Sequence, residues 1–305
     1  GFGDVGEVEE LGRYGRAGDT VQVPEGRGRL TAAVGDRWVS FDRAFVPGIT
    51  LDGVCTPAPS GDAWAHVPAA QTEVIVGIDM VVGKARRRTI PVPAFGVERV
   101  TVSHARFRSA LEAAGEWTAP PLEQNLLTAT SELSLEERAT WDRRPVTYVQ
   151  LSDAQRYAER SGLRVPTTAE WQLAVEGGDV RWIADAPTQS LRLGRPSSDL
   201  AFSDQANPDT FLAATADVDD DAYRAGPLGL FHPIGNVAEL TSSPVESTSP
   251  GSTISAGFTV TRGRAWFHSI SEDRTKLLYA YGFIPPSSGD WSVGFRCGKG
   301  QAPPG

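Results

Sequence analysis

The sequence predicts an α+β fold in which helices come early, short strands come late and turns occupy much of the chain. The helical patterns lie before residue 180, whereas after it we expect loops interrupted by short strands. The 32 Gly and 22 Pro residues, spread along 305 positions, indicate many turns and little long helix. Eight Trp residues supply large apolar surfaces for the core of a fold that is poor in regular structure.

Residues 1–65 are predicted to form a β-rich extension of unknown role, and residues 66–305 the main domain. Gly, Pro and Asp separate short strand-like pieces in the extension, as in small β-hairpins. These pieces are Thr20–Val23, Trp38–Phe41 and Ala44–Leu51. The segment Thr56–Asp62 has the composition of a linker, so we place the domain boundary there.

The main domain is expected to begin with strands and then to form helices with recognisable N-caps. The expected strands are Val74–Ile78 and Thr89–Phe95, and after residue 180 short strands near Phe258–Arg262 and Gly294–Cys297. The expected helices are Val102–Ala113 with Ser103 as N-cap, Ser152–Ser161 with Ser152 as N-cap, and Thr167–Glu176. Thr167 and Glu170 have the spacing of a capping box, and Trp171 and Ala174 are expected to point inward.

The charge balance makes a nucleic-acid partner unexpected. The net charge is −9, and the one basic cluster, Lys84–Arg88, lies between two apolar runs and is predicted to be a solvated loop. No apolar stretch approaches the roughly 18 residues that span a bilayer. Residues 1–20 are polar and acidic, unlike a signal peptide. We therefore expect no membrane span; the compartment stays open, with the cytoplasm favoured over export.

The chain contains only two cysteines, Cys55 and Cys297. Two cysteines cannot form a disulfide framework in a chain of this length. They either form one bond between the extension and the C-terminal part or remain two buried thiols, and we favour the buried thiols.

Four segments stand out, in order along the chain: Pro93–Phe107 (PAFGVERVTVSHARF), Pro145–Gly178 (PVTYVQLSDAQRYAERSGLRVPTTAEWQLAVEGG), Gly229–Ser242 (GLFHPIGNVAELTS), and Arg262–Trp266 (RGRAW) paired with Gly294–Cys297 (GFRC). Together they resemble the formylglycine-generating enzyme, or sulfatase-modifying factor, family. The second and third segments are highly specific. The resemblance implies the family's variant of the C-type lectin fold, with little regular secondary structure.

The resemblance also shows which catalytic groups are missing. The parent enzymes oxidise a substrate cysteine with two active-site cysteines that bind copper, and thiolates are the ligands that soft Cu(I) prefers. Counted from RGRAW, the matching positions are His268 and Asp273. We therefore expect neither copper nor formylglycine-generating activity. Some family members carry a structural cysteine at the position of Cys297, and the position that would pair with it is Ala158.

Two other metal sites remain open in the sequence. His268 and Asp273 would suit iron or zinc, which would make the chain a metal-dependent oxidoreductase that modifies a peptide or small molecule, although two ligands make a weak site. Calcium is implied by the resemblance, because the family holds this ion in the matching glycine-asparagine turn. The corresponding positions are His232, Gly235, Val237 and Glu239. His232 replaces an expected oxygen ligand, which damages the set.

The segment between the closing motifs is the best candidate for binding. It is rich in aromatic and arginine side chains, which are enriched at recognition surfaces. In lectin-fold proteins, including the variable proteins of diversity-generating retroelements, the matching segment faces the ligand. We expect a non-catalytic module that binds a protein, peptide or small ligand; a domain that serves only its own polypeptide is a third hypothesis. The candidate contact residues are Arg264, Phe267, His268, Arg274, Tyr279, Tyr281, Phe283 and Trp291.

Overall fold

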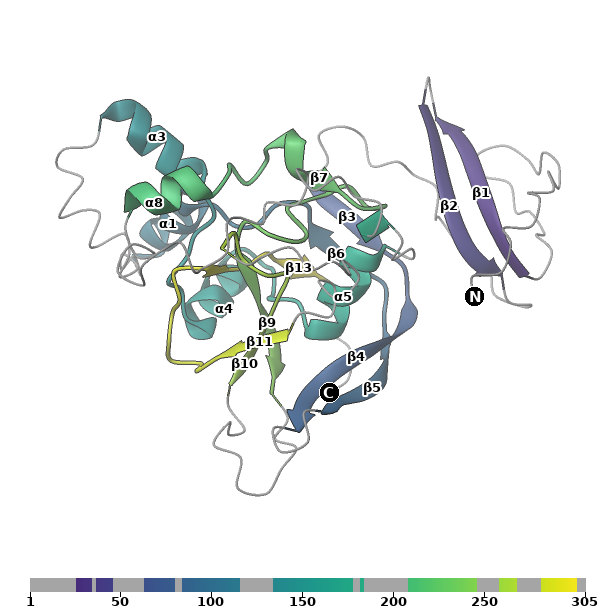
Figure 1. Ribbon diagram of the computed structural model, residues 1–305. Coiled ribbons are helices and arrows are strands. Elements are labelled where there is room, and N and C mark those ends of the chain that lie inside the picture. Colours follow the sequence, from purple (N-terminus) through teal and green to yellow (C-terminus); the bar gives the residue numbers. More distant parts are fainter. Residues whose placement is uncertain are drawn as a thin grey trace. The chain divides into compact units, whose positions relative to one another are not determined.

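The computed structural model describes residues 26–34, 37–45, 63–79, 84–115, 134–177, 182–183, 208–245, 258–267 and 281–300. The chain divides into two compact units, Gly1–Pro57 and Ala58–Gly305. The first unit contains an antiparallel hairpin of β1 (Gly26–Val34) and β2 (Arg37–Phe45) (Figure 1). β2 includes the predicted strand Trp38–Phe41, whereas Thr20–Val23 and Cys55 lie outside the described residues.

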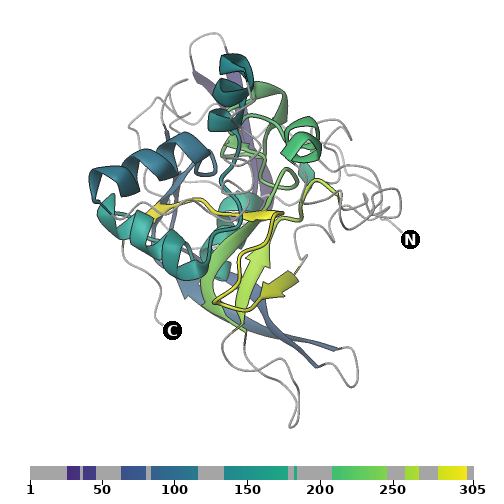
Figure 2. The same cartoon turned by 90° about the vertical axis from the view of Figure 1, so that its left-hand side faces the viewer.

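The second unit combines short sheets with helices that pack around them (Figures 1 and 2). One sheet has the strand order β11-β10-β9-β12 and another the order β13-β6-β3, while β4 pairs with β5 and β7 with β8. The strands are β3 (Trp64–Val67), β4 (Ala70–Asp79), β5 (Lys84–Val92), β6 (Phe95–Glu98), β7 (Arg224–Ala225), β8 (Leu230–Phe231), β9 (Ala238–Pro244), β10 (Thr259–Arg262), β11 (Tyr281–Ile284), β12 (Val293–Gly294) and β13 (Gly298–Lys299). Because β3 pairs with β6, Trp64 and Ala65 belong to this unit rather than to the extension.

The helices differ from the expected set in number. They are α1 (His104–Ala113), α3 (Leu135–Arg143), α4 (Leu151–Arg160), α5 (Thr168–Glu176), α8 (Pro208–Ala214) and a 3-10 turn at Asp221–Tyr223. The expectation of no helix after residue 180 is therefore wrong, because α8 buries Phe211 there. α3 was not expected, since Trp141 is the one buried residue of an otherwise polar helix. None of the described helices is long and apolar enough to cross a membrane.

The basic cluster is also placed differently, because it forms the first part of β5 instead of a loop. β5 pairs with β4 in a two-stranded antiparallel ribbon, in which Val74 lies opposite Arg88. The ribbon is fixed to α5 where Gln172 Nε2 donates to the carbonyl of Glu73 at 2.7 Å. The sequence predicted a solvated loop because the basic cluster lies between two apolar runs, but strand pairing with β4 overrides that preference.

Two of the three predicted N-caps are confirmed. Ser103 Oγ accepts the N–H of Arg106 at the start of α1, and the capping box of Thr167 and Glu170 begins α5. The predicted cap Ser152 is wrong: α4 begins one residue earlier, Gln150 is its N-cap, and Asp153 accepts the Gln150 N–H at 3.2 Å. The earlier start lets Leu151 pack against the core, and Ser152 is left exposed in the first turn.

Replacing Thr167 with alanine is expected to lower the free energy of unfolding by about 1 kcal/mol, because the hydroxyl that caps α5 is lost. In the native helix Thr167 Oγ1 accepts the Glu170 N–H at 3.2 Å, and the Thr167 N–H donates to the Glu170 carboxylate at 2.8 Å. Urea unfolding followed by circular dichroism measures the change. Ser152→Ala is the matched control, expected to stay within about 0.5 kcal/mol. Equal losses at both positions would contradict the capping role.

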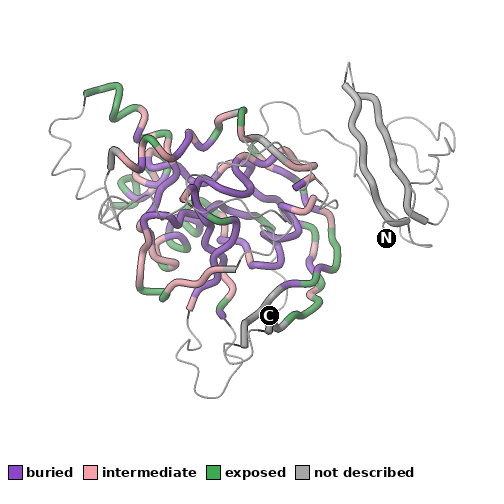
Figure 3. Tube along the Cα trace, viewed as in Figure 1, coloured by how far each residue is buried: buried purple, intermediate pink, exposed green. Residues whose placement is uncertain are grey.

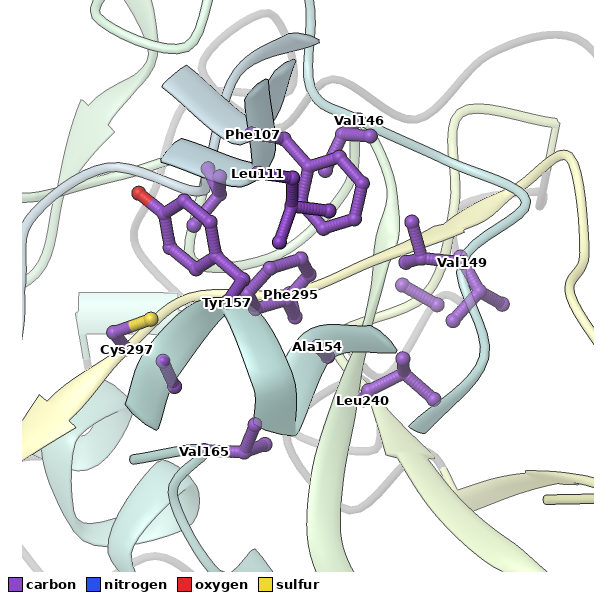
Figure 4. Close-up of a cluster of buried hydrophobic side chains, with 14 of the residues drawn as sticks. Phe107, Leu111, Val146, Val149, Ala154, Tyr157, Val165, Leu240, Phe295 and Cys297 are labelled. Carbon is purple, nitrogen blue, oxygen red and sulfur yellow. The ribbon is translucent and has the colours of Figure 1, made fainter. Parts of the chain in front are cut away.

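The core consists of three clusters of buried apolar side chains, and Figure 3 shows the buried residues concentrated at the centre of this unit. One cluster surrounds Trp171 on α5 and includes side chains from β3, β4, β5 and β6. A second joins α1, α4 and the sheet through Phe107, Tyr157 and Phe295 (Figure 4), and a small third one contains Trp141 and Phe211. The predicted inward positions Trp171 and Ala174 are confirmed; in fact every side chain from Thr168 to Val175 is buried.

Residues 293–299 tie separate parts of this unit together. β12 pairs in parallel with β9, and β13 pairs antiparallel with β6. Between these strands, the carbonyl of Phe295 accepts the Val102 N–H at 2.9 Å, and the carbonyl of Cys297 accepts the Glu98 N–H at 2.9 Å. One short segment therefore joins two sheets and the approach to α1.

Candidate functional site

We call the region between Arg264 and Trp291 the 264–291 surface. It begins where β10 leaves the four-stranded sheet and continues through β11 to the segment before β12. β10 pairs with β9 on one side and with β11 on the other, where Thr259 lies opposite Ile284 and Arg262 opposite Tyr281. All four residues of β10 are buried. The connection from β10 to β11 therefore starts at a buried strand and ends at the half-buried strand paired with it.

A tight double turn fixes the start of this surface. Gly235 and Asn236 form one of its turns, with positive φ values of 92° and 62°. The Gly235 N–H donates to the carbonyl of Gly263 at 2.8 Å, and the Trp266 N–H donates to the carbonyl of Asn236 at 3.0 Å. Arg264, between these contacts, is exposed and has a φ of 61°, an unfavourable conformation for a side chain of this size.

Three aromatic side chains, Trp266, Phe267 and Trp291, form what we call the aromatic cluster. The Trp291 ring lies 5.0 Å from the Trp266 ring and 4.8 Å from the Phe267 ring, centroid to centroid. Trp266 and Trp291 are 2% and 7% exposed, whereas Phe267 is half-buried. The indole N–H of Trp266 has no acceptor among the residues that the structure describes. The cluster holds the two ends of the 264–291 surface together.

Only some of the remaining predicted contact residues lie within the described ranges. Phe283 on β11 is half-buried and packs edge-on against Phe258, with ring centroids 5.7 Å apart. Tyr281 is described only as a strand residue. His268, Asp273, Arg274 and Tyr279 lie outside the described residues. The structure thus brings Phe267 and Trp291 into contact, and the other predicted contacts stay predictions.

Tyr148 adjoins this surface and was missed by sequence reasoning. Its backbone has a φ of 60°, and its N–H donates to the carbonyl of Asp290 at 3.0 Å. A Cβ at Gly289 would collide with the Tyr148 carbonyl, so the two segments approach at a glycine. Burial, followed by the nearby Asp290 carboxylate, raises the pKa of the Tyr148 phenol above its usual value. No local pattern pairs Tyr148 with Asp290, because they are distant in sequence.

Glu239, one of the four positions implied for calcium, forms a buried ion pair with Arg296. Each side chain is 1% exposed. Arg296 Nε donates to Oε2 at 2.6 Å and Nη2 to Oε1 at 2.5 Å, while Trp171 Nε1 donates to Oε2 at 2.9 Å. Arg296 also donates to the carbonyls of residues 98, 99 and 231. Every N–H of the guanidinium is therefore used, and a positive charge already neutralises this carboxylate.

His232, the second side chain of that set, is turned towards another part of the chain. Its Nε2 lies 2.8 Å from the carbonyl of Asp217, and its ring stacks on Tyr223 with centroids 4.9 Å apart. An imidazole thus stands where calcium would need an oxygen ligand. Together with the Glu239–Arg296 pair, this arrangement does not fit a calcium site at His232, Gly235, Val237 and Glu239.

Removal of divalent ions is accordingly expected to leave the stability of the protein unchanged. Thermal unfolding should give the same Tm, within about 2 °C, after dialysis against EDTA and after addition of millimolar calcium. Calcium would raise the Tm only by binding the folded state, and the side chains at these positions do not offer it a site. Differential scanning calorimetry on both samples measures the effect. A calcium-dependent rise of several degrees would restore the calcium site implied by the resemblance.

Cys297 is a free, buried thiol packed in the same cluster as Ala158, so no disulfide forms at the position where some family members have one. Burial raises its pKa well above the ordinary value, and the charge and hydrogen bond of Glu98 raise it further. Glu98 in turn pairs with Arg106. This part of the buried-thiol prediction is confirmed, while Cys55 lies outside the described residues.

We expect Cys297 to be unreactive in the native protein at pH 8, because only the thiolate attacks and its pKa is raised. In a Cys55→Ser background, a chromogenic disulfide reagent should release no colour until denaturant is added, and then one equivalent. Colour released from the native protein at the rate of the unfolded chain would contradict the buried, protonated thiol.

Comparison with known proteins agrees with this geometry. The family model described as "Sulfatase-modifying factor enzyme 1-like domain" matches residues 61–300. The "Inactive C-alpha-formylglycine-generating enzyme 2" of Bos taurus is 28% identical over 176 residues, which are 53% of this chain and 52% of that protein. The chain therefore spans about half the length of that curated relative.

Two solved structures share the fold at low sequence identity. CarF superposes with a TM-score of 0.50 and 16% identity over 79% of this chain and 98% of its own. Treponema denticola variable protein 1 superposes with a TM-score of 0.51 and 16% identity over 88% of this chain and 98% of its own. With a family model that covers most of the chain, the protein belongs to the sulfatase-modifying factor enzyme 1-like family and has that family's variant of the C-type lectin fold.

Proposed function

We propose that this chain is a non-catalytic recognition module that binds a protein, peptide or small ligand through the 264–291 surface. The aromatic cluster carries the proposal. It places a half-buried phenylalanine, Phe267, on two nearly buried indoles at the stem of the surface. Aromatic side chains that neighbours hold rigid lose little conformational entropy on binding and dominate many interfaces.

The chemistry of the chain favours binding over oxidation. The positions that match the family's copper-binding cysteines are His268 and Asp273, and neither supplies a thiolate. The curated relative carries the description "inactive", and the variable protein from Treponema denticola has the same fold. These likenesses support a scaffold that has kept its recognition surface while the oxidising centre is absent.

Selection from a displayed peptide library tests the proposal. Peptides are selected on the wild-type chain, and their affinities are then measured for three single variants, Arg264→Ala, Phe267→Ala and Phe283→Ala. We expect losses of about 10-fold or more for at least two variants, the range found for aromatic and arginine anchors. Glu112→Ala, at an exposed position on α1, is the control and should change affinity less than about twofold.

Two outcomes would overturn the proposal. Selected peptides that bind all four variants alike would show that recognition occurs elsewhere on the chain. Alternatively, one equivalent of iron, zinc or copper that His268→Ala abolishes, together with oxygen consumption, would replace the recognition module with a metal-dependent oxidoreductase. Circular dichroism of each variant separates loss of contact from loss of folding. Because the Arg264 side chain is exposed to solvent, Arg264→Ala is the variant expected to disturb folding least.

A further inference from the structure

Asp290 lies at the end of the 264–291 surface, directly before Trp291, and is a half-buried carboxylate. Its Oδ1 accepts the Ser292 N–H at 2.8 Å and the Ser292 hydroxyl at 2.5 Å. No lysine or arginine of the described ranges forms an ion pair with it. By comparison, the three fully buried carboxylates of the described ranges, Glu98, Glu170 and Glu239, each pair with an arginine.

Two residues with aromatic side chains neighbour Asp290 from separate segments. The Tyr148 N–H donates to the backbone carbonyl of Asp290 at 3.0 Å, where Gly289 lets the two segments approach closely. Burial is the larger cause of the raised pKa of the Tyr148 phenol, and the Asp290 carboxylate is near enough to raise that pKa further. Trp291, the next residue, lies within the aromatic cluster beside Phe267. A half-buried carboxylate thus neighbours Tyr148 and Trp291, and no lysine or arginine of the described ranges is paired with it. Burying such a charge is costly unless an opposite charge pairs with it.

We infer that Asp290 and Tyr148 form a subsite for an organic cation of the ligand, and this inference rests on the proposed function. The cation would be the ammonium of a lysine or the guanidinium of an arginine. The carboxylate supplies an ion pair whose strength rises in its half-buried setting. Tyrosine and tryptophan rings attract cations through their negative faces. The net charge of −9 over the chain draws a cationic ligand towards the protein.

The simplest other role of Asp290 is to cap the turn that leads into β12. Its carbonyl accepts the Val293 N–H at 3.1 Å, and its side chain holds Ser292. Asp290→Asn separates the two roles, because the amide oxygen keeps the acceptor for Ser292 while the charge is lost. A cap survives this replacement, whereas a cation subsite does not.

The test uses three small probes on the full chain labelled with 15N at its indoles. They are the N-acetyl methylamides of lysine, arginine and norleucine, the last an uncharged analogue of similar shape. We expect the two cationic probes to shift the Trp291 indole signal saturably and norleucine to bind about 5-fold more weakly or not at all. Asp290→Asn should weaken the binding of the two cationic probes by about the same 5-fold factor. Asp219→Asn, at an exposed aspartate, should leave their affinity unchanged.

Equal binding of lysine and norleucine probes, full affinity in Asp290→Asn, or no binding of either cationic probe would each overturn the cation subsite. These outcomes leave the wider proposal to its own experiment. If selected peptides depend on Phe267 and Phe283 while the cationic probes do not bind at Asp290, the recognition surface stands and only its cation subsite fails. If selected peptides ignore those phenylalanines, the recognition surface fails whatever the probes show.

Discussion

Arg296→Met is expected to destabilise the lectin-like unit by about 3–5 kcal/mol, the range measured when one partner of a buried ion pair is removed. Glu239 would keep its charge at 1% exposure with only Trp171 donating to it. The carbonyls of residues 98, 99 and 231 would also lose a donor. Since whole domains are stable by only about 5–15 kcal/mol, a loss of this size should also lower the soluble yield of the Arg296→Met variant. Urea unfolding followed by tryptophan fluorescence measures the loss.

Two further variants show whether the buried charge causes that loss. Arg87→Met removes an arginine from an ion pair with Glu73 in which both side chains are about half exposed. This matched control should cost at most about 1 kcal/mol. In the double variant Arg296→Met, Glu239→Gln neither position carries a charge, so part of the stability should return. Equal effects of Arg296→Met and Arg87→Met would contradict the importance assigned to the buried pair.

Phe295→Ala is the second change with a large expected effect, a loss of about 3–5 kcal/mol in the free energy of unfolding. Phe295 is fully buried, and its ring meets those of Phe107 and Tyr157 edge-on, with centroids 6.0 and 5.5 Å apart (Figure 4). Helices α1 and α4 surround this ring, so the cavity left by the substitution cannot close easily. Equilibrium unfolding in guanidinium chloride gives the difference.

Leu135→Ala provides the comparison for that experiment. Leu135 is the large apolar side chain most exposed among the described residues, at 88%, and its removal creates no cavity. We expect a change within about 0.5 kcal/mol. If Phe295→Ala lowered the free energy of unfolding as little as Leu135→Ala, the packing of Phe295 between α1, α4 and the sheet would not contribute substantially to stability.

The features that could be predicted from sequence are those that depend on neighbouring residues. Ser103, Thr167 and Glu170 cap helices through contacts three residues away, so their spacing is visible in the sequence. Gly235 and Asn236 form a turn whose positive φ values suit those residue types. The fold class followed from these local features and from the segments that resemble the family.

The features that could not be predicted depend on partners far away in the chain. Glu239 was considered as a calcium ligand because the resemblance implied it, and nothing local in the sequence shows that Arg296 reaches it. Tyr148 approaches Asp290 only once the fold is formed, so its place beside the 264–291 surface has no sequence pattern. Ser152 satisfies the rule for an N-cap, yet packing of Leu151 against the core places the helix start at Leu151 with Gln150 as the N-cap, which shows packing overriding local preference.

The segment 293–299 has a consequence for biosynthesis. Phe295, Arg296 and Cys297 fill the core and bond to residues 98–102, which the ribosome makes nearly two hundred codons earlier. Domains generally fold as units as the chain emerges. Here β6, α1 and β9 must wait, with their apolar faces uncovered, until Lys299 has cleared the exit tunnel. Nascent chains stalled before that point should need chaperones that shield apolar surface, and a frameshift close to the 3′ end of this region should be as damaging as one at its start.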